Sequence, residues 1–235
     1  MRRRSEGVLI GGEATAAPLP YPAEEIIAAL EPLATEARAA RVQGVLSRRL
    51  ASVTVVVDSL HDPHNGAAIV RSCDAFGVQY FHAIERHEPF AAARAVARGS
   101  QKWVDVVRHP GPAACIAALR ASGHELIATH PEGELVPEDL ARIPKVALVL
   151  GNERDGIMPD VRAACTRAVR VPMSGFVESL NVSVTTAILL FAATRGREGD
   201  LDEATRRTLY ARGLWQTVPR AHEHVEAVRV HAQRG

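Results

Sequence analysis

The sequence has little of several features that mark common classes of protein. No apolar run reaches the roughly 18 residues that a membrane-spanning helix needs, and the charge-free stretch 179–194 is short and contains serine, asparagine and threonine. Aromatic residues make up only 4% of the chain, fewer than a protein that stacks bases on an aromatic platform normally has. The three cysteines, Cys73, Cys115 and Cys165, are odd in number and far apart. They exclude a disulfide framework and a CxxC zinc site, and they fit a reducing compartment.

Charge of neither sign is in excess. The 28 basic and 27 acidic residues give a net charge of +1, which excludes a polybasic protein but not a local basic face. The basic start, Met1 to Arg4, is followed by glycine, glutamate and proline instead of an apolar segment, so we expect no secretory signal. Apolar residues make up 47% of the chain, enough to bury a real core. We therefore expect a folded cytoplasmic protein without a membrane segment.

The distribution of proline, alanine and charge predicts four parts. Residues 1–22 are proline- and glycine-containing and are expected to form a flexible tail, and residues 23–50 a helical extension with a break at Pro32. Residues 51–195 have the pattern of an α/β core, and residues 196–235 are again charged and helical in pattern.

Within the core, strand and helix patterns alternate. The β-branched run Val53–Val57 predicts a buried strand. Asn65 is expected to cap the first helix, which Gly77 ends, and Asn181 to cap the last. Further strands are predicted over 79–84, 104–107, 125–129, 146–150 and 169–171. Helices are predicted over about 91–98 and 112–122, with a short helix that starts at Pro159 and a last helix that ends at about Thr194. This alternation indicates an α/β fold with a mostly parallel sheet.

Three loops that leave apolar strands are unusually polar. They are residues 62–65, 151–156 and 172–181. Each alone could be a turn with a helix cap, but three at strand ends favour a shared ligand site, because ligands of open α/β sheets bind beyond the carboxyl ends of strands. The loops contain no P-loop, GxGxxG or GxSxG signature. His61 and His64 lack further ligands in the sequence pattern, so we expect no metal.

Arginines offer two open interpretations. Arg71, in the helix after the first strand, is either a solvated surface residue or an anion-binding guanidinium. On a helix over residues 33–49, four arginines fall within an arc of about 100°, which suits either a solvated face or contact with phosphates: Arg38, Arg41, Arg48 and Arg49.

Three ordered segments match the motifs of a known family: residues 57–77, 148–157 and 171–183. The chain resembles the SpoU class of knotted (SPOUT) RNA 2′-O-methyltransferases, and within it the tRNA guanosine 2′-O-methyltransferase branch. The resemblance covers about residues 33–220. It implies a parallel sheet sandwiched by helices, with a C-terminal trefoil knot and helical extensions at both ends. It also implies S-adenosylmethionine as methyl donor and a homodimer whose site draws on both subunits.

The resemblance also assigns roles to residues at the motif positions. It implies that the cofactor meets Thr129, Gly151, Val171, Met173 and Leu180. The catalytic set that it implies is Arg71, Asn65, Glu153, Ser179 and Asn181. RNA contacts are expected from Arg38, Arg41, Arg48, Arg49 and His64.

The implied reaction is attack of a ribose 2′-oxygen on a sulfonium methyl group. A guanidinium has a pKa above 12, which makes Arg71 a poor base, so we expect it to hold the substrate phosphate and stabilise the developing alkoxide. The expected substrate is the D-loop guanosine of tRNA. Ribosomal RNA, a non-catalytic RNA-binding knot protein and a small-molecule enzyme on an ordinary α/β fold remain as alternatives.

Overall fold

The chain divides into two compact units. The computed structural model describes residues 13–14, 18–86, 90, 99–152 and 154–232. Of these, residues 18–49 and 199–232 belong to unit 1, and residues 13–14 and 50–198 belong to unit 2. Each unit is described by itself.

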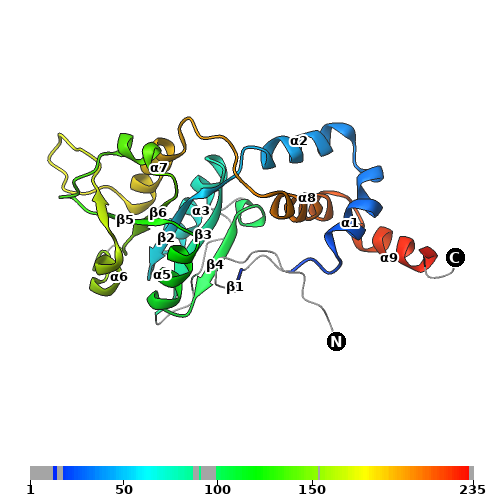
Figure 1. Cartoon of the computed structure of the whole chain (residues 1–235), viewed down its shortest axis with the longest axis horizontal. Coiled ribbons are helices and arrows are strands. Elements are labelled where there is room, and N and C mark those ends of the chain that lie inside the picture. The colour runs from blue at the N-terminus through cyan, green and yellow to red at the C-terminus, as the bar shows by residue number, and fades with distance from the viewer. Residues whose placement is uncertain (1–12, 15–17, 87–89, 91–98, 153, 233–235) are drawn as a thin grey trace. The chain divides into compact units, whose positions relative to one another are not determined.

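Unit 2 is built on one seven-stranded sheet with the order β1-β4-β3-β2-β6-β5-β7 (Figure 1). Among the residues that the structure describes, six strands of the sheet are parallel, and the short β1 pairs antiparallel with β4. The strands are β1 (Glu13–Ala14), β2 (Leu50–Asp58), β3 (Val78–Ile84), β4 (Asp105–His109), β5 (Glu125–Thr129), β6 (Val146–Leu150) and β7 (Arg167–Val169). The predicted α/β fold with a mostly parallel sheet is confirmed.

Helices cover both faces of this sheet. They are α3 (Pro63–Ala75), η2 (Ser100–Lys102), α5 (Pro112–Ala121), η3 (Pro137–Arg142), α6 (Pro159–Ala164) and α7 (Val182–Thr194). One face packs against α3, η3 and α7 through residues such as Ile69, Leu140 and Leu189. The other packs against α5 and α6 through Leu119 and Val161. Strands buried on both faces explain why β2 and β6 are almost continuously apolar.

Unit 1 consists of helices from both ends of the chain. They are α1 (Ala23–Leu30), η1 (Glu31–Leu33), α2 (Glu36–Leu46), α8 (Glu203–Thr217) and α9 (Ala221–Ala232). Packing of α1 against α8 and α9 buries Ile26 and Leu30, and the Tyr210 hydroxyl donates to Glu31 Oε1 at 2.7 Å. The predicted break near Pro32 is confirmed by η1. No helix of the described residues is long and apolar enough to cross a membrane.

The structure corrects three local predictions. Asp62, and not Asn65, caps α3: Pro63 occupies the first turn, and Asp62 Oδ1 accepts the His64 N–H at 2.8 Å. Helix α2 ends at Leu46, so the single helical arc of four arginines is wrong. Strand β7 ends at Val169, two residues before the predicted end. The helix predicted over 91–98 lies outside the described residues.

Two buried histidines lie side by side in unit 2. His82 in β3 and His109 at the end of β4 are fully buried, and His82 Nδ1 lies 2.8 Å from His109 Nε2. Burial, together with the nearby His109 and His124, lowers the pKa of His82 to about 3. Burial also lowers the pKa of His109. Both imidazoles are therefore neutral in the folded protein at pH 7.

We predict that the free energy of unfolding falls as the pH drops from about 6.5 towards 3. In this range the unfolded chain binds a proton at His82 that the folded chain does not, which gives a slope of up to about 1.4 kcal/mol per pH unit from this histidine. The lowered pKa of His109 acts in the same direction. Urea unfolding at pH 6.5 and pH 5 measures the slope. The His82→Gln variant should lose part of it, and His61→Gln, whose imidazole is exposed, should keep it. Equal slopes for His82→Gln and the unaltered protein would contradict the prediction.

Candidate active site

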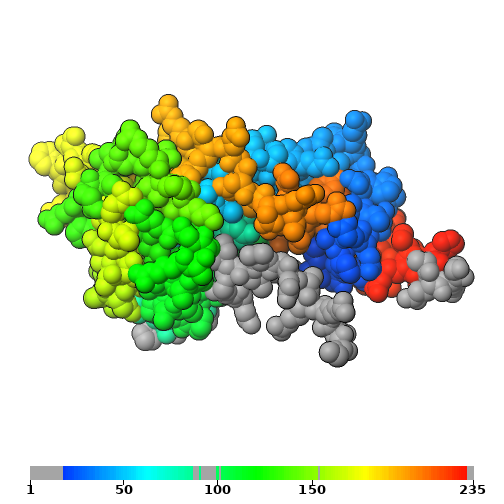
Figure 2. Space-filling view, viewed as in Figure 1, coloured from blue at the N-terminus to red at the C-terminus, as the bar shows by residue number. Residues whose placement is uncertain are grey.

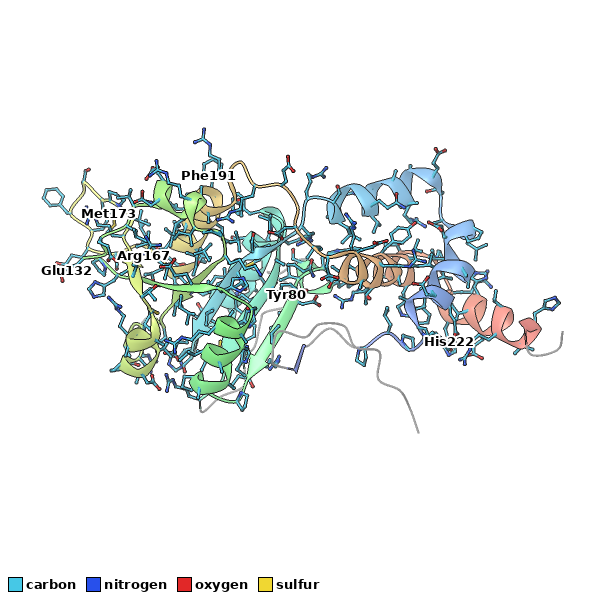
Figure 3. The ribbon with its side chains drawn as sticks, viewed as in Figure 1. Tyr80, Glu132, Arg167, Met173, Phe191 and His222 are labelled. Atoms are coloured by element: carbon cyan, nitrogen blue, oxygen red, sulfur yellow. The ribbon has the colours of Figure 1, made fainter. Side chains whose placement is uncertain are left out.

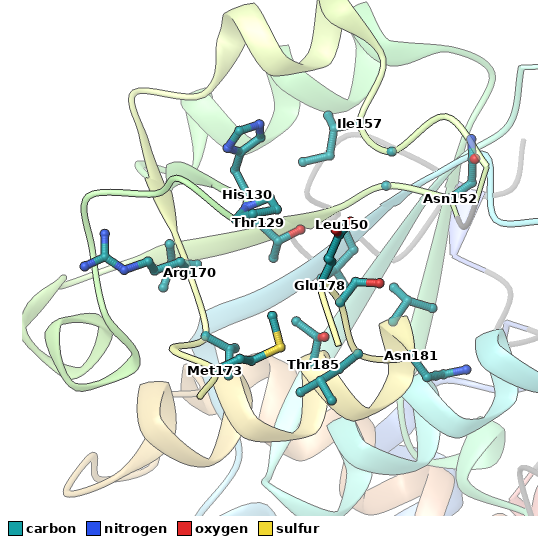
Figure 4. A pocket seen from close by; sticks show the side chains of 18 residues that line it. Thr129, His130, Leu150, Asn152, Ile157, Arg170, Met173, Glu178, Asn181 and Thr185 are labelled. Atoms are coloured by element: carbon teal, nitrogen blue, oxygen red, sulfur yellow. The ribbon is translucent and has the colours of Figure 1, made fainter. Parts of the chain in front are cut away.

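A cavity of about 460 Å³ opens at the carboxyl ends of β5, β6 and β7. Its walls come from the three segments that follow these strands, and Thr129, Met173 and Thr185 point into the same space (Figure 4). The segment between β7 and α7, coloured yellow in Figure 2, lies at the surface of unit 2. The position of the cavity agrees with the rule for open parallel sheets.

The cavity combines apolar walls with a few polar groups. The apolar residues include Leu150, Ile157, Val169, Val171 and Leu180, and the polar side chains are those of Thr129, His130, Asn152, Glu178, Ser179, Asn181 and Thr185, with Arg170 at the wall. Such a lining suits a ligand with a flat apolar part and several polar groups. A nucleoside-sized molecule has this character.

Gly151, directly after β6, has no room for a side chain. A Cβ at this position would lie 2.0 Å from the backbone carbon of Gly156 and 2.2 Å from the backbone nitrogen of Ile157. Gly156 has a φ of 67°, in the left-handed region that favours glycine. The two glycines therefore allow the loop after β6 to fold back on itself beside the cavity.

Asn152 holds the same loop in a tight turn. Its backbone exchanges two hydrogen bonds with Gly156, at 3.1 and 3.2 Å. Its side-chain Oδ1 accepts the backbone N–H groups of Arg154 and Asp155 at 2.9 and 2.7 Å. Asn152 is buried and lines the cavity, so it fixes the backbone that a ligand would meet.

The wall after β5 is held by contacts with β6 and β7. Thr129 Oγ1 donates to the Val149 carbonyl at 3.1 Å, and the backbone N–H of His130 donates to the Val169 carbonyl at 3.0 Å. A Cβ on Gly133 would lie 2.7 Å from the Val169 carbonyl carbon. The segment after β5 therefore runs in close backbone contact with β7, which leaves the cavity walls little freedom.

Asn181 connects the cavity to α3. Its Oδ1 accepts the Ser183 N–H at 2.8 Å and so caps α7, as predicted. Its Nδ2 donates to Asn65 Oδ1 at 3.0 Å. Asn181 therefore caps α7 and also holds the side chain of Asn65, which lies 116 positions earlier in the sequence.

The structure brings together most of the residues that the motifs suggested. Ser179 and Asn181 line the cavity, and Asn65 contacts Asn181. All five expected cofactor residues also line it: Thr129, Gly151, Val171, Met173 and Leu180. Met173 lies in the segment before α7 (Figure 3). Glu153 lies outside the described residues. Arg71 is exposed on α3 and is not among the residues that line the cavity.

Sequence reasoning missed other lining residues. Asn152 lies inside the second motif segment and Glu178 inside the third, and His130 follows Thr129 directly. Their neighbours in the sequence could have suggested them. Thr185 gave no such signal, because it lies one turn into α7.

The expected RNA-contacting residues are distributed unevenly. Arg41, Arg48 and His64 are exposed, and Arg38 is half-buried. Arg49 is only 2% exposed, so the expectation that its side chain faces RNA is not supported. Arg48 and Arg49 also follow the end of α2 instead of continuing its face.

The fold and the cavity define an α/β protein with a nucleoside-sized ligand site at the carboxyl edge of a parallel sheet. The sequence profile of the SpoU rRNA Methylase family matches residues 52–191, and the chain belongs to this family.

The chain is similar in sequence to proteins named as tRNA methyltransferases and to one named as a ribosomal RNA methyltransferase. The chain is 36% identical over 169 residues to the tRNA (guanosine(18)-2′-O)-methyltransferase of Thermus thermophilus, covering 69% of this chain and 84% of the relative. It is 34% identical over 162 residues to the Escherichia coli enzyme of the same name, covering 68% and 71%. It is 36% identical over 153 residues to a 23S rRNA (guanosine-2′-O-)-methyltransferase of Xanthomonas axonopodis pv. citri, covering 63% and 60%.

Solved structures show the same fold. The TrmH/SpoU tRNA modifying enzyme of A. aeolicus superposes with a TM-score of 0.69 and 30% identity over 78% of this chain and 98% of that one. A SpoU methyltransferase of Streptomyces viridochromogenes, solved in complex with the cofactor AdoMet, superposes with a TM-score of 0.53 and 26% identity, covering 63% and 58%.

Proposed function

We propose that the protein methylates a ribose 2′-oxygen of RNA with S-adenosylmethionine, and that its substrate is the D-loop guanosine of tRNA. The observation that supports this most is the cavity itself, because the loops of the second and third motif segments form its walls together with Thr129. The sequence match to the Thermus thermophilus tRNA enzyme covers 69% of this chain and 84% of that relative, against 63% and 60% for the ribosomal RNA relative, which favours tRNA. A tRNA substrate would place the protein in the cytoplasm.

The cavity residues fit S-adenosylmethionine. The apolar walls at Leu150, Val171 and Leu180 suit an adenine ring, and the backbone exposed at Gly151 can pair with its polar edge. We propose that Thr129, Gly151, Val171, Met173 and Leu180 bind it. The bound cofactor supplies an electrophilic methyl group on a positively charged sulfur.

The acceptor would be positioned by polar side chains beside the cavity. We propose that Asn65, held by Asn181, and the exposed hydroxyl of Ser179 orient the ribose. Glu153 is proposed to brace the loop after β6. Arg71 would hold the substrate phosphate and stabilise the negative charge that develops on the 2′-oxygen as its proton passes to solvent water and the sulfur of the cofactor departs with the S–C electron pair. Alignment of the attacking oxygen provides most of the remaining catalysis.

RNA would also contact surfaces outside the cavity. We propose that Arg38, Arg41 and Arg48 of unit 1, and His64 at the start of α3, contact the RNA backbone. Guanidinium groups on exposed or half-buried side chains can neutralise phosphates without a large desolvation cost. Arg49 is left out of this set because it is buried.

We further propose a homodimer and a knotted core. Helix α7 is apolar on both sides: Leu189 and Leu190 are buried in the core, and Val184, Ile188 and Phe191 are 47, 36 and 60% exposed. A helix that is apolar all round is normally covered on both sides, and a second copy would cover the outer stripe. Phe191 of this stripe is labelled in Figure 3. The knot is proposed from the resemblance, and the convergence of segments after β5, β6 and β7 is consistent with it.

The homodimer makes a testable prediction about α7. Val184→Arg should weaken dimerisation at least about 100-fold, because a charge would be buried in an apolar interface. Sedimentation velocity over a concentration series measures this. Val228→Arg, on an equally exposed valine of α9, should leave the dimer intact. A monomeric unaltered protein at micromolar concentration, or a dimer that Val184→Arg does not affect, would refute the proposal.

The proposed reaction is tested by transfer of labelled methyl from S-adenosylmethionine to unmodified tRNA. Ribosomal RNA and a tRNA with the D-loop guanosine replaced run in parallel. Label on tRNA that disappears from the replaced transcript is the expected result. Label only on ribosomal RNA would keep the chemistry and overturn the substrate, and no label on either RNA would overturn the enzymatic proposal.

A further inference from the structure

The loop after β6 is anchored at its far end by a second group of residues. This loop, residues 151–158, carries Gly151, Asn152, Gly156 and Ile157 to the cavity wall, and α6 begins directly after it. Asp58, the last residue of β2, has a fully buried side chain, and its Oδ2 accepts the backbone N–H of Met158 at 3.0 Å. The two residues are 100 positions apart in the sequence.

Asp58 is also paired with Arg86, which follows β3. Arg86 Nε donates to Asp58 Oδ1 at 2.9 Å and Nη2 to Asp58 Oδ2 at 3.3 Å. The Ser59 hydroxyl donates to Asp58 Oδ1 at 3.4 Å. The two carboxylate oxygens therefore accept all four donors, which an amide could not do because one of its two atoms is a donor.

The same guanidinium reaches α6. Arg86 Nη1 donates to Asp160 Oδ2 at 3.0 Å and Nη2 to Asp160 Oδ1 at 2.6 Å. The hydrogen bonds to Asp160 and Asp58 hold the pKa of Arg86 above its usual value, so it is charged at all relevant pH values. Asp58, Arg86 and Asp160, here called the Asp58 clamp, thus join the ends of β2 and β3 to the first turn of α6.

The Asp58 clamp and the turn formed by Gly151 and Gly156 restrain opposite ends of the loop 151–158. Gly151 and Gly156 fix the end next to β6, and the Asp58 clamp fixes Met158 and Asp160. No residue of the Asp58 clamp lines the cavity. An ion pair with a buried carboxylate and a bidentate arginine is geometrically more specific than an exposed pair.

We propose that Asp58 and Arg86 are positioning residues that set the affinity of the cavity for S-adenosylmethionine by holding the loop 151–158 against it. This rests on the proposed function, since it takes the cavity to be the methyl-donor site. The residues act through the loop backbone and touch neither cofactor nor RNA. Loss of the Asp58 clamp releases the loop at Met158 and leaves the acceptor-side residues Asn65 and Asn181 in place.

The test compares cofactor binding with turnover. Isothermal titration with S-adenosylmethionine should show a Kd raised at least about 10-fold in Asp58→Asn and Arg86→Gln, and methyl transfer to tRNA should show KM for S-adenosylmethionine raised to match. The kcat at saturating S-adenosylmethionine should stay within about 3-fold of the unaltered protein. Arg86→Lys keeps the charge but not the bidentate geometry, so its Kd for S-adenosylmethionine should lie between the values of the unaltered protein and Arg86→Gln.

Arg108→Gln is the matched control. Arg108 pairs with Glu85, the neighbour of Arg86, through Nη1 at 2.8 Å, but does not contact Met158 or Asp160. Its Kd should stay within about 2-fold of the unaltered value. If Asp58→Asn does not fold, as thermal unfolding will show, Arg86→Gln and Arg86→Lys still decide.

The outcomes separate the two proposals. An unaltered protein that does not bind S-adenosylmethionine would refute the proposed function. Binding by the unaltered protein, with an unchanged Kd in folded Arg86→Gln, would overturn only the positioning role. A fall in kcat without a change in KM, or an equal loss in Arg108→Gln, would also overturn it.

Discussion

Arg71→Ala is expected to lower methyl transfer to tRNA by at least about 1,000-fold while the Kd for S-adenosylmethionine changes less than about 3-fold. The physical reason is position. Arg71 is exposed on α3 and is not among the residues that line the cavity, so its removal should leave the walls of the cofactor site intact. The proposed function assigns it to the substrate phosphate and the developing charge on the 2′-oxygen, which only the transfer step would sense.

Two measurements check this expectation. Isothermal titration gives the cofactor Kd, and single-turnover transfer of labelled methyl to tRNA gives the rate of the chemical step. Arg71→Lys should recover only a small part of the rate, because an ammonium group lacks the fork that binds a phosphate through two hydrogen bonds. Loss of cofactor binding in Arg71→Ala, or a rate within about 10-fold of the unaltered protein, would contradict the assignment.

Gly151→Ala is expected to weaken binding of S-adenosylmethionine at least about 100-fold, equivalent to about 2.7 kcal/mol. The new methyl group would lie 2.0 Å from the Gly156 backbone carbon, and the contacted atoms are backbone, which cannot rotate away as a side chain could. The loop must therefore move out of the cavity wall.

A second glycine provides the control for this variant. Gly111 precedes α5, has an extended backbone, and has open space around the position of a Cβ. Gly111→Ala should leave the cofactor Kd unchanged. Circular dichroism and thermal unfolding establish that Gly151→Ala is folded, and a folded Gly151→Ala that binds normally would show that the loop backbone does not contact the cofactor.

Strand and helix order in unit 2 could be predicted because both depend on local pattern. The β-branched and apolar runs of β2 and β6 specify buried strands on their own, and Gly77, with a φ of 76°, ends its helix as expected. The cavity was also predictable in outline, since parallel strands bring their following loops to one edge.

The errors come from competition between neighbouring residues for one structural role. Asp62 and Asn65 are both good caps, and Pro63 decides between them because it fits the first turn of a helix. Asn65 is thereby left to bind Asn181. Nothing local to residue 65 indicates this partner.

The contacts of Asp58 and Arg86 were not predictable for a related reason. A single aspartate at a strand end and a single arginine after another strand have no distinctive pattern. Their partners are Met158 and Asp160, which the fold brings to them from the far end of the loop after β6.

The double role of Asn181 has a consequence for enzyme assays. Helix α7 begins at the residue that orients Asn65, and the same helix carries the apolar stripe assigned to a second copy. If the proposed homodimer forms, the second copy would pack on the helix whose first turn orients Asn65, and dissociation would remove that support. Specific activity would then depend on enzyme concentration: it would fall on dilution below the dimer Kd and recover when the protein is concentrated again.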